Sequence, residues 1–279
     1  MNSMTGATQK DIEHHYDVSN NFFMKWLDSS MAYSAAKFEK NTDSLGQAQL
    51  NKINEHLDNL MIKTGDRILD IGCGWGSLLD VASQRGIKAH GLTLSSNQVE
   101  YVKNKNMLGV SVELNDWRDA NFNELFDGVV SIGAFEHFTK PDISSVERIA
   151  VYREFFKKAA SFVKDGGYLS LQTICFDKMK EQDIKSFIKN KIFPNSMLPR
   201  IQEIFTASDG IFTVKKMTNT PNDYDKTCSI WSENIESQRD EIIDLVGEKI
   251  YNDYCNYLKM SSKAFKYKGF GLLRIQFQR

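Results

Sequence analysis

The sequence lacks several features that would assign a protein to a broad class at once. None of its apolar runs reaches about 18 residues, the length of a membrane-spanning helix, so we expect no transmembrane segment. The N-terminal stretch MNSMTGATQKDIEHHYDVSN contains no apolar core of the kind that secretory signal peptides carry. Internal repeats and low-complexity tracts are also missing. These absences favour a globular protein located in the cytoplasm.

The sequence also has few cysteines and almost no net charge. The 279 residues include four cysteines, Cys73, Cys175, Cys228 and Cys255, and none of them forms a CxxC pair. Such wide spacing is typical of reduced thiols and offers no structural zinc site. The formal net charge is -1, so no overall field would attract nucleic acid. We therefore expect neither a metal site nor a nucleic-acid partner.

The feature that the sequence does have is an alternation of short buried strands with helical stretches. The expected strands are RILDI, KAHGLTL, VSVEL, FDGVVSI and YLSLQTI, and helices are expected after most of them, including one over residues 145–164. Strands that alternate with helical crossovers predict an α/β fold with a doubly wound, mostly parallel sheet. A chain of this length can bury the core of one large domain or the cores of two small ones.

Further elements are expected on both sides of this core. Helices over residues 9–28 and 42–60 would form an N-terminal helical cap, residues 1–60, and a helical insertion on the substrate side would span residues 175–210. Two helices over 222–265 and the strands IFTVKKM and GLLRIQFQ would complete the domain, the strands as a hairpin-like edge. The lysine-rich helix 178–192 either touches anionic lipid or is a solvated helix packed on the sheet.

A glycine-rich turn joins the first expected strand to its helix. The stretch LDIGCGWGS places Gly72, Gly74 and Gly76 where backbone N–H groups can face a ligand, although a tight turn without a ligand has the same pattern. The dinucleotide fingerprint needs GxGxxG and an acidic residue after the next strand. Here the spacing is GxGxG, and the next strand ends in GLTLSSNQ. NAD is therefore disfavoured, and S-adenosylmethionine fits better.

Two more stretches carry candidate site residues. In NDWRD, Trp117 follows the third expected strand and either packs against an adenine or is an ordinary core or surface tryptophan. In FDGVVSIGAFEHF, Glu136 and His137 follow the fourth strand as an acid–base pair, half of a metal site, or plain loop residues. Because adjacent side chains point apart, a metal site is disfavoured.

Five stretches in this order, HYDVSNNFF, MAYSAAKF, LDIGCGWGS, GLTLSSNQ and SIGAFEHF, together with the C-terminal YLKMSSKAFKYKGFGLLRIQFQR, resemble the cyclopropane-fatty-acid synthase family, in particular its compact mycolic acid cyclopropane synthase members. The resemblance covers nearly the whole chain. It implies a single S-adenosylmethionine-dependent methyltransferase domain over residues 1–279, with the class I, Rossmann-like fold, an N-terminal helical segment and a helical insertion covering the site.

The resemblance also implies a set of cofactor contacts. Tyr33 and Ser34 would reach over the methionine end, and the turn that ends at Gly76 would form the cofactor loop. The residues expected to bind S-adenosylmethionine are Tyr33, Ser34, Asp70, Gly72, Cys73, Gly74, Gly76, Thr93, Leu94, Gln98, Trp117, Arg118 and Ile132.

The reaction of the family starts with an alkene that attacks the sulfonium methyl and leaves a carbocation, which a base then deprotonates. The base is commonly a bicarbonate ion. The resemblance assigns the family's carboxylate to Glu136, its tyrosine to Tyr224, and its backbone contacts to Ala35 and Ile132. Gln172 stands where the family has a histidine, and a glutamine carries neither a proton nor a charge near neutral pH. Ala35 and Ser261 replace two family cysteines.

These departures leave three functions open. The acceptor is an unsaturated acyl chain, as in a lipid, methylated with or without ring closure; or it is a small molecule methylated on carbon or nitrogen; or the chain is an inactive S-adenosylmethionine-binding module. His137 is a neighbour of the cofactor or a base. If a weakened bicarbonate site survives beside Gln172, a histidine at that position is expected to raise bicarbonate-dependent activity. The oligomeric state stays open.

Overall fold

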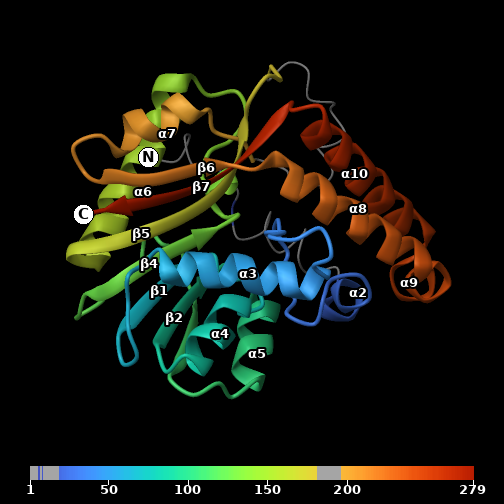
Figure 1. The fold of residues 1–279 in the computed structure, drawn as a ribbon, viewed down its shortest axis with the longest axis horizontal. Helices are drawn as coiled ribbons and strands as arrows, with labels where there is room; N and C mark the ends of the chain where they lie inside the picture. The colour runs from blue at the N-terminus through green and yellow to red at the C-terminus, as the bar shows by residue number, and fades with distance from the viewer. Residues whose placement is uncertain (1–5, 7, 9–18, 181–195) are drawn as a thin grey trace.

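The computed structural model describes residues 6, 8, 19–180 and 196–279 (Figure 1). All five strands expected in the first part of the chain are present. The sheet has seven strands in the order β3-β2-β1-β4-β5-β7-β6. Their bounds are β1 (Arg67–Ile71), β2 (Lys88–Thr93), β3 (Val110–Leu114), β4 (Phe126–Ile132), β5 (Val163–Phe176), β6 (Thr213–Asn219) and β7 (Phe270–Gln278).

The pairing confirms the predicted doubly wound, mostly parallel sheet. Strands β1 to β5 pair in parallel, and β7 runs antiparallel to both of its neighbours, β5 and β6. The last two strands therefore form the expected hairpin-like edge, with the C-terminal strand inserted between β5 and β6. Gln172 of β5 and Arg274 of β7 face each other in this register.

Helices cover both faces of the sheet (Figure 1). On one face lie α3 (Leu45–Asp58), α4 (Ser77–Gln84) and α5 (Ser96–Asn104), and on the other lie α6 (Ser145–Phe162) and α7 (Ile201–Ser208). Each face has its own buried cluster: Ile53, Leu57 and Leu79 pack with Ile68 on the first, whereas Phe155 packs with residues of β4 and β5 on the second.

A third buried cluster lies between α2 (Asn20–Met24), α8 (Pro221–Ser237), α9 (Arg239–Val246) and α10 (Glu248–Lys266), which gather at the right of Figure 1. Trp26 and Trp231 are fully buried in it, with ring centroids 5.7 Å apart. The expectation of two helices over 222–265 is wrong, because the chain forms three. Gly247, with φ of 83°, ends α9, a conformation that favours glycine.

Serine side chains fix where several helices begin. Ser19, Ser44, Ser95 and Ser144 each accept a hydrogen bond from the backbone N–H three residues further along, which satisfies a donor that the helix itself leaves unpaired. Ser144 completes a capping box with Glu147. The N-cap expected at Ser95 is confirmed.

Residues 9–18 and 181–195 lie outside the described residues, and they hold half of the expected helix 9–28 and most of the expected helix 178–192. The limits of the cap (1–60) and the insertion (175–210) stay predictions, and so does the amphipathic helix 178–192. Within the described ranges, no helix has the length and apolar character needed to cross a bilayer.

Candidate active site

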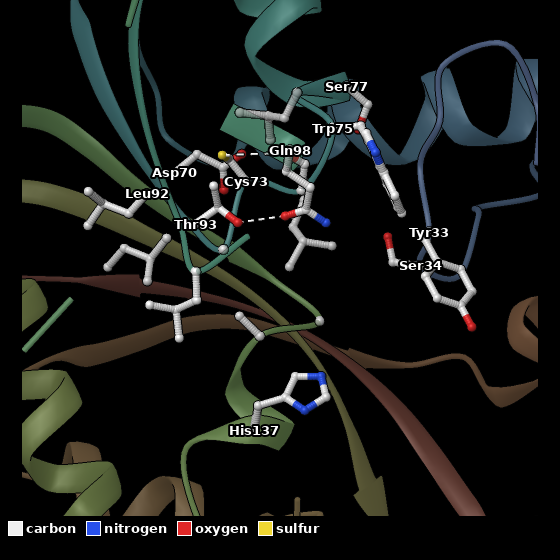
Figure 2. A pocket seen from close by; sticks show the side chains of 18 of the residues that line it. Tyr33, Ser34, Asp70, Cys73, Trp75, Ser77, Leu92, Thr93, Gln98 and His137 are labelled. Atoms are coloured by element: carbon white, nitrogen blue, oxygen red, sulfur yellow. Dashed lines mark hydrogen bonds between the residues drawn. The ribbon is translucent and has the colours of Figure 1, made fainter. Parts of the chain in front are cut away.

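Loops at the carboxyl ends of β1, β2 and β4 enclose a first cavity, and the α2–α3 connection (residues 25–44) closes it from another side (Figure 2). Figure 2 shows Asp70, Thr93 and Gln98 from the sheet side, Tyr33 and Ser34 from the connection, and His137 from the turn after β4. Of the thirteen cofactor residues named above, twelve line this cavity; the exception is Gly76.

The glycines of the turn have different roles. Gly74 has φ of 55°, and nothing lies within 4 Å of the position that a Cβ would take, so its backbone is open to the cavity that it lines. A Cβ at Gly76 would meet the Cγ2 atom of Val102 at 2.8 Å. Gly76 therefore permits the close packing of α4 on α5 and does not itself line the cavity.

Polar and aromatic groups shape the rest of the first cavity. The Thr93 hydroxyl donates to Gln98 Oε1 at 2.6 Å, which fixes the end of β2 to the start of α5. Trp117 is 5% exposed, packs against the Phe138 ring at 5.2 Å, and carries the Arg118 guanidinium 4.4 Å from its ring centroid. Trp117 is therefore a core residue that also lines the cavity, and its packing against an adenine stays a prediction.

A second cavity shares one wall with the first. Tyr33, Ser34, Gly133 and His137 line both. The other residues of the second cavity are mostly apolar and come from the turn after β4, from β5, β7, α8 and α10, and from the residues before α7: Glu136, Gln172, Ile174, Ser196, Met197, Leu198, Tyr224, Tyr257, Ser261, Phe265, Phe270 and Leu272. The structure thus places Glu136, Gln172 and Tyr224 in the lining of one cavity, and their catalytic roles stay predictions.

Glu136 is the buried carboxyl group of the second cavity. Its Oε1 atom accepts a hydrogen bond from the Ile174 N–H at 2.6 Å, while Oε2 has no hydrogen-bond partner among the described residues. Burial raises the pKa of Glu136 to about 7, and the bond from Ile174 opposes that rise. The group therefore exists in both protonation states near neutral pH, with one oxygen available to a bound molecule.

His137 has partners of its own, although it is adjacent to Glu136. Its Nδ1 atom lies 2.7 Å from Ser196 Oγ, and burial lowers its pKa to about 4. The imidazole is therefore neutral near pH 7. Because it lines both cavities, it can contact the cofactor and the acceptor alike.

Gln172 is held by charged and polar neighbours rather than pointing freely into the cavity. Arg274 Nε donates to Gln172 Oε1 at 2.8 Å, and His56 Nε2 lies 3.4 Å from the same oxygen. The amide nitrogen lies 3.5 Å from the Ala35 carbonyl oxygen. The carboxamide oxygen is thus occupied, and the side chain offers N–H groups toward Ala35 and the second cavity.

Arg274 also orders the surroundings of Tyr224. Its Nη1 atom donates to Asp223 at 2.9 Å, and its Nη2 atom to the Ala36 carbonyl at 2.9 Å. The Tyr224 ring stacks on Phe265 with centroids 4.4 Å apart. One buried cation therefore connects β5, the α2–α3 connection and the start of α8.

Sequence reasoning missed the polar residues that α3 contributes to the site. Gln49, Lys52 and His56 are fully or almost fully buried, and Lys52 lines the first cavity. They lie on the same helical face as Ile53 and Leu57, at spacings of three and four residues. The signal that could have revealed them is the presence of polar side chains on the apolar face of the helix. Burial of a polar side chain costs free energy unless it has hydrogen-bond partners in the protein interior.

Comparison with known proteins agrees with this geometry. Residues 4–275 match the family model described as mycolic acid cyclopropane synthetase. Cyclopropane mycolic acid synthase 2 of Mycobacterium bovis is 35% identical, over 92% of this chain and 90% of that protein. The chain belongs to this family. Cyclopropane-fatty-acyl-phospholipid synthase of Escherichia coli is 32% identical, over 96% of this chain and 67% of that protein.

A solved structure of a family member extends the likeness to the fold. The mycolic acid cyclopropane synthase CmaA1, complexed with SAH and CTAB, superposes with a TM-score of 0.88 at 30% identity, covering 98% of this chain and 99% of that chain. The chain is accordingly an S-adenosylmethionine-dependent methyltransferase of the class I, Rossmann-like fold. Its first cavity has the features that this cofactor requires, an open glycine turn and an aromatic side chain beside a polar loop.

Proposed function

We propose that this enzyme methylates an unsaturated acyl chain. S-adenosylmethionine would occupy the first cavity and the acyl chain the second, and the methyl group would pass beside the shared residues Tyr33, Ser34, Gly133 and His137. The observation that carries this proposal is the apolar lining of the second cavity by Ile174, Met197, Leu198, Phe265, Phe270 and Leu272. Buried apolar walls favour a hydrocarbon ligand.

Family relatives support this choice of acceptor. Two relatives are named for mycolic acid and for fatty acyl phospholipid, and CmaA1 was solved with the lipid mimic CTAB. A phospholipid acceptor would bring the enzyme to a membrane surface. We therefore include peripheral membrane contact in the proposal.

The polar groups of the second cavity have defined tasks in this reaction. As the alkene carbon bonds to the methyl carbon, the bond from that carbon to sulfur breaks and a positive charge appears on the acyl chain. The ionised Glu136 carboxylate and the Tyr224 ring are groups that stabilise such a cation. Because water would capture the cation, the apolar walls protect it.

Loss of a proton decides the product. Removal from the new methyl group closes a cyclopropane ring, and removal from a neighbouring carbon leaves a methylated alkene. A bicarbonate ion is a suitable base here, because Gln172 and Tyr224 line the second cavity and their side chains carry N–H and O–H donors for an anion. Gln172 itself accepts no proton.

A second function is favoured by one observation. Since Gln172 replaces the imidazole that the family uses, the site suits a reaction that needs no added base, such as methylation of a small molecule on carbon or nitrogen. Its acceptor would carry a hydrogen-bonding group for Gln172 and Glu136.

Labelled S-adenosylmethionine separates the two functions. We expect the purified enzyme to label vesicles of monounsaturated phospholipid and to leave vesicles of the saturated phospholipid of equal chain length unlabelled. Mass analysis would show the gain of one carbon and two hydrogens, and catalytic hydrogenation of the product would distinguish a ring from a retained double bond. Omission of bicarbonate tests the base. Label in amines alone, with none in lipid, would overturn the acyl proposal.

A further inference from the structure

Lys52 is a buried lysine that forms no ion pair within the described part of the chain. Its side chain belongs to a residue that is 1% exposed, in the middle of α3, and it borders the first cavity. The ammonium nitrogen donates to two neutral oxygens, Ser34 Oγ at 2.8 Å and Gln49 Oε1 at 2.6 Å. Among the described residues, no carboxylate forms an ion pair with it. Lysines are almost never fully buried unless they are paired, so this one calls for an anionic partner.

The charges that face Lys52 come from four elements. Asp28 of the α2–α3 connection and Asp70 of β1 favour its charged form, whereas Arg274 of β7 and burial oppose it. His56, on its own helix, is neutral because burial lowers its pKa to about 3. The balance lowers the pKa of Lys52 to about 7, and burial raises the pKa of Asp70 to about 7. An arriving anion would shift this balance towards ammonium.

The position of Lys52 indicates which anion this is. Its ammonium nitrogen contacts Ser34, on the wall of the first cavity where Tyr33 and Ser34 are expected to reach over the methionine end of the cofactor. A cofactor whose adenine is near Trp117 brings its methionine end to this wall, and that end carries a carboxylate and an ammonium group. One of the three ammonium hydrogens of Lys52 remains after the bonds to Ser34 and Gln49.

We propose that Lys52 binds the carboxylate of the cofactor's methionine end and takes up a proton as that carboxylate enters. The proposal rests on the placement of S-adenosylmethionine in the first cavity and is independent of the acceptor. Lys52 thereby makes cofactor affinity depend on pH. In the free enzyme the proton leaves Lys52 at lower pH than in the complex, so affinity is full in mildly acidic solution and declines as pH rises.

A comparison of two ligands measures the contribution of the cofactor's amino-acid end, which carries the carboxylate. S-adenosylhomocysteine keeps the amino-acid end, whereas 5′-methylthioadenosine has the same nucleoside and lacks that end. Isothermal titration at about pH 8, in two buffers of different ionisation enthalpy, measures the protons taken up on binding. We expect S-adenosylhomocysteine to take up between about 0.5 and 1 proton and 5′-methylthioadenosine none. Asp70 is already mostly ionised at this pH and adds little to the count.

Variants separate binding from packing. Lys52→Met is expected to raise the dissociation constant of S-adenosylhomocysteine at least about tenfold and to change that of 5′-methylthioadenosine less than about twofold. It should also abolish proton uptake. The control is Gln49→Leu, which removes the bond that Gln49 Oε1 accepts from Lys52 at 2.6 Å and the bonds to the Ala32 and Ser34 carbonyls at 3.2 and 2.9 Å, but keeps the Lys52 amine. It should weaken both ligands alike and preserve proton uptake.

Three results would overturn the proposal. The first is the absence of proton uptake in the wild-type enzyme. The second is an equal loss of affinity for both ligands in Lys52→Met, and the third is proton uptake that persists in that variant. The wild-type measurement requires no variant to fold. If S-adenosylhomocysteine does not bind at all, the result contradicts the placement of the cofactor in the first cavity. If the ligands bind normally but acyl chains are not methylated, the result contradicts only the proposed acceptor.

Discussion

At the scale of single residues, Glu136 sets the pH behaviour that we expect. Burial raises its pKa to about 7, and the ionised form is the one that stabilises a cation. As pH falls through this value the ionised fraction falls, so kcat should drop about tenfold per pH unit below pH 7. Glu136→Gln should lower kcat about 100-fold or more and give a flat pH profile. A flat wild-type profile from about pH 5.5 to 8 would contradict this role.

The same variant has a predicted effect on stability. The pKa of glutamate is ordinarily 4.5, and that of folded Glu136 is about 7. Burial of Glu136 therefore leaves the free energy of unfolding unchanged in acid, where the group is protonated in both states. Above pH 7, where the group is ionised in both states, burial lowers that free energy by its full amount. That amount is at most on the order of 3 kcal/mol. Glu136→Gln should therefore raise the melting temperature more at about pH 8 than at about pH 5, a difference that thermal unfolding measures directly.

Gln172 shows how a neighbour changes an expectation. From the sequence, a histidine at this position would rebuild the anion site of the family. In the structure, however, Arg274 Nε donates to the glutamine oxygen at 2.8 Å, and an imidazole there would face the guanidinium. The positive charge of Arg274 would lower the pKa of the new histidine and disfavour its charged form.

We accordingly expect Gln172→His to be destabilised by about 1–3 kcal/mol and to gain no bicarbonate-dependent activity. Gln172→Glu is the matched control, because a carboxylate of nearly equal size would pair with Arg274 and keep the melting temperature at about pH 8. Thermal unfolding and bicarbonate titration of both variants check this. A histidine variant as stable as the glutamate variant would show that Arg274 does not set the environment.

At the scale of elements, β7 separates two environments by alternation. Leu272 packs in the cluster between α2, α8 and α10 and lines the second cavity, whereas Leu273 packs in the cluster beneath α6. Successive residues of a strand point to opposite faces, so neighbours of identical type have different roles. The pattern of the sequence, GLLRIQFQ, predicted the strand and could not indicate which leucine lines the second cavity.

Leu272→Phe tests the position of the acceptor. The larger side chain should narrow the second cavity and raise the KM for the lipid acceptor about tenfold, while the dissociation constant of S-adenosylhomocysteine changes less than about twofold. Leu273→Met is the control, since a swap of similar volume in the opposite cluster should leave KM unchanged. Equal effects of the two variants on KM would argue against acyl binding beside β7.

At the scale of the whole molecule, three buried clusters surround the two cavities. Two of them attach helices to the faces of the sheet, and the third joins α2 to α8, α9 and α10 at its end. Trp75, from the glycine turn, donates to Asn20 Oδ1 of α2 at 2.7 Å and so connects the sheet to the third cluster. The cavities lie where these three units meet, so residues far apart in sequence form each wall.

The sequence by itself determined the strands, most helix starts and the glycine turn, and its resemblance to the family supplied the candidates Glu136, Tyr224 and Gln172. These depend on local periodicity, capping and motif spacing, which residues close in the chain control. Only the tertiary structure decided that Gln172 is bound by Arg274, that Gly76 serves packing, and that Lys52 borders the first cavity. Those facts depend on burial and on charges brought together from distant strands and helices, and no local pattern contains that information.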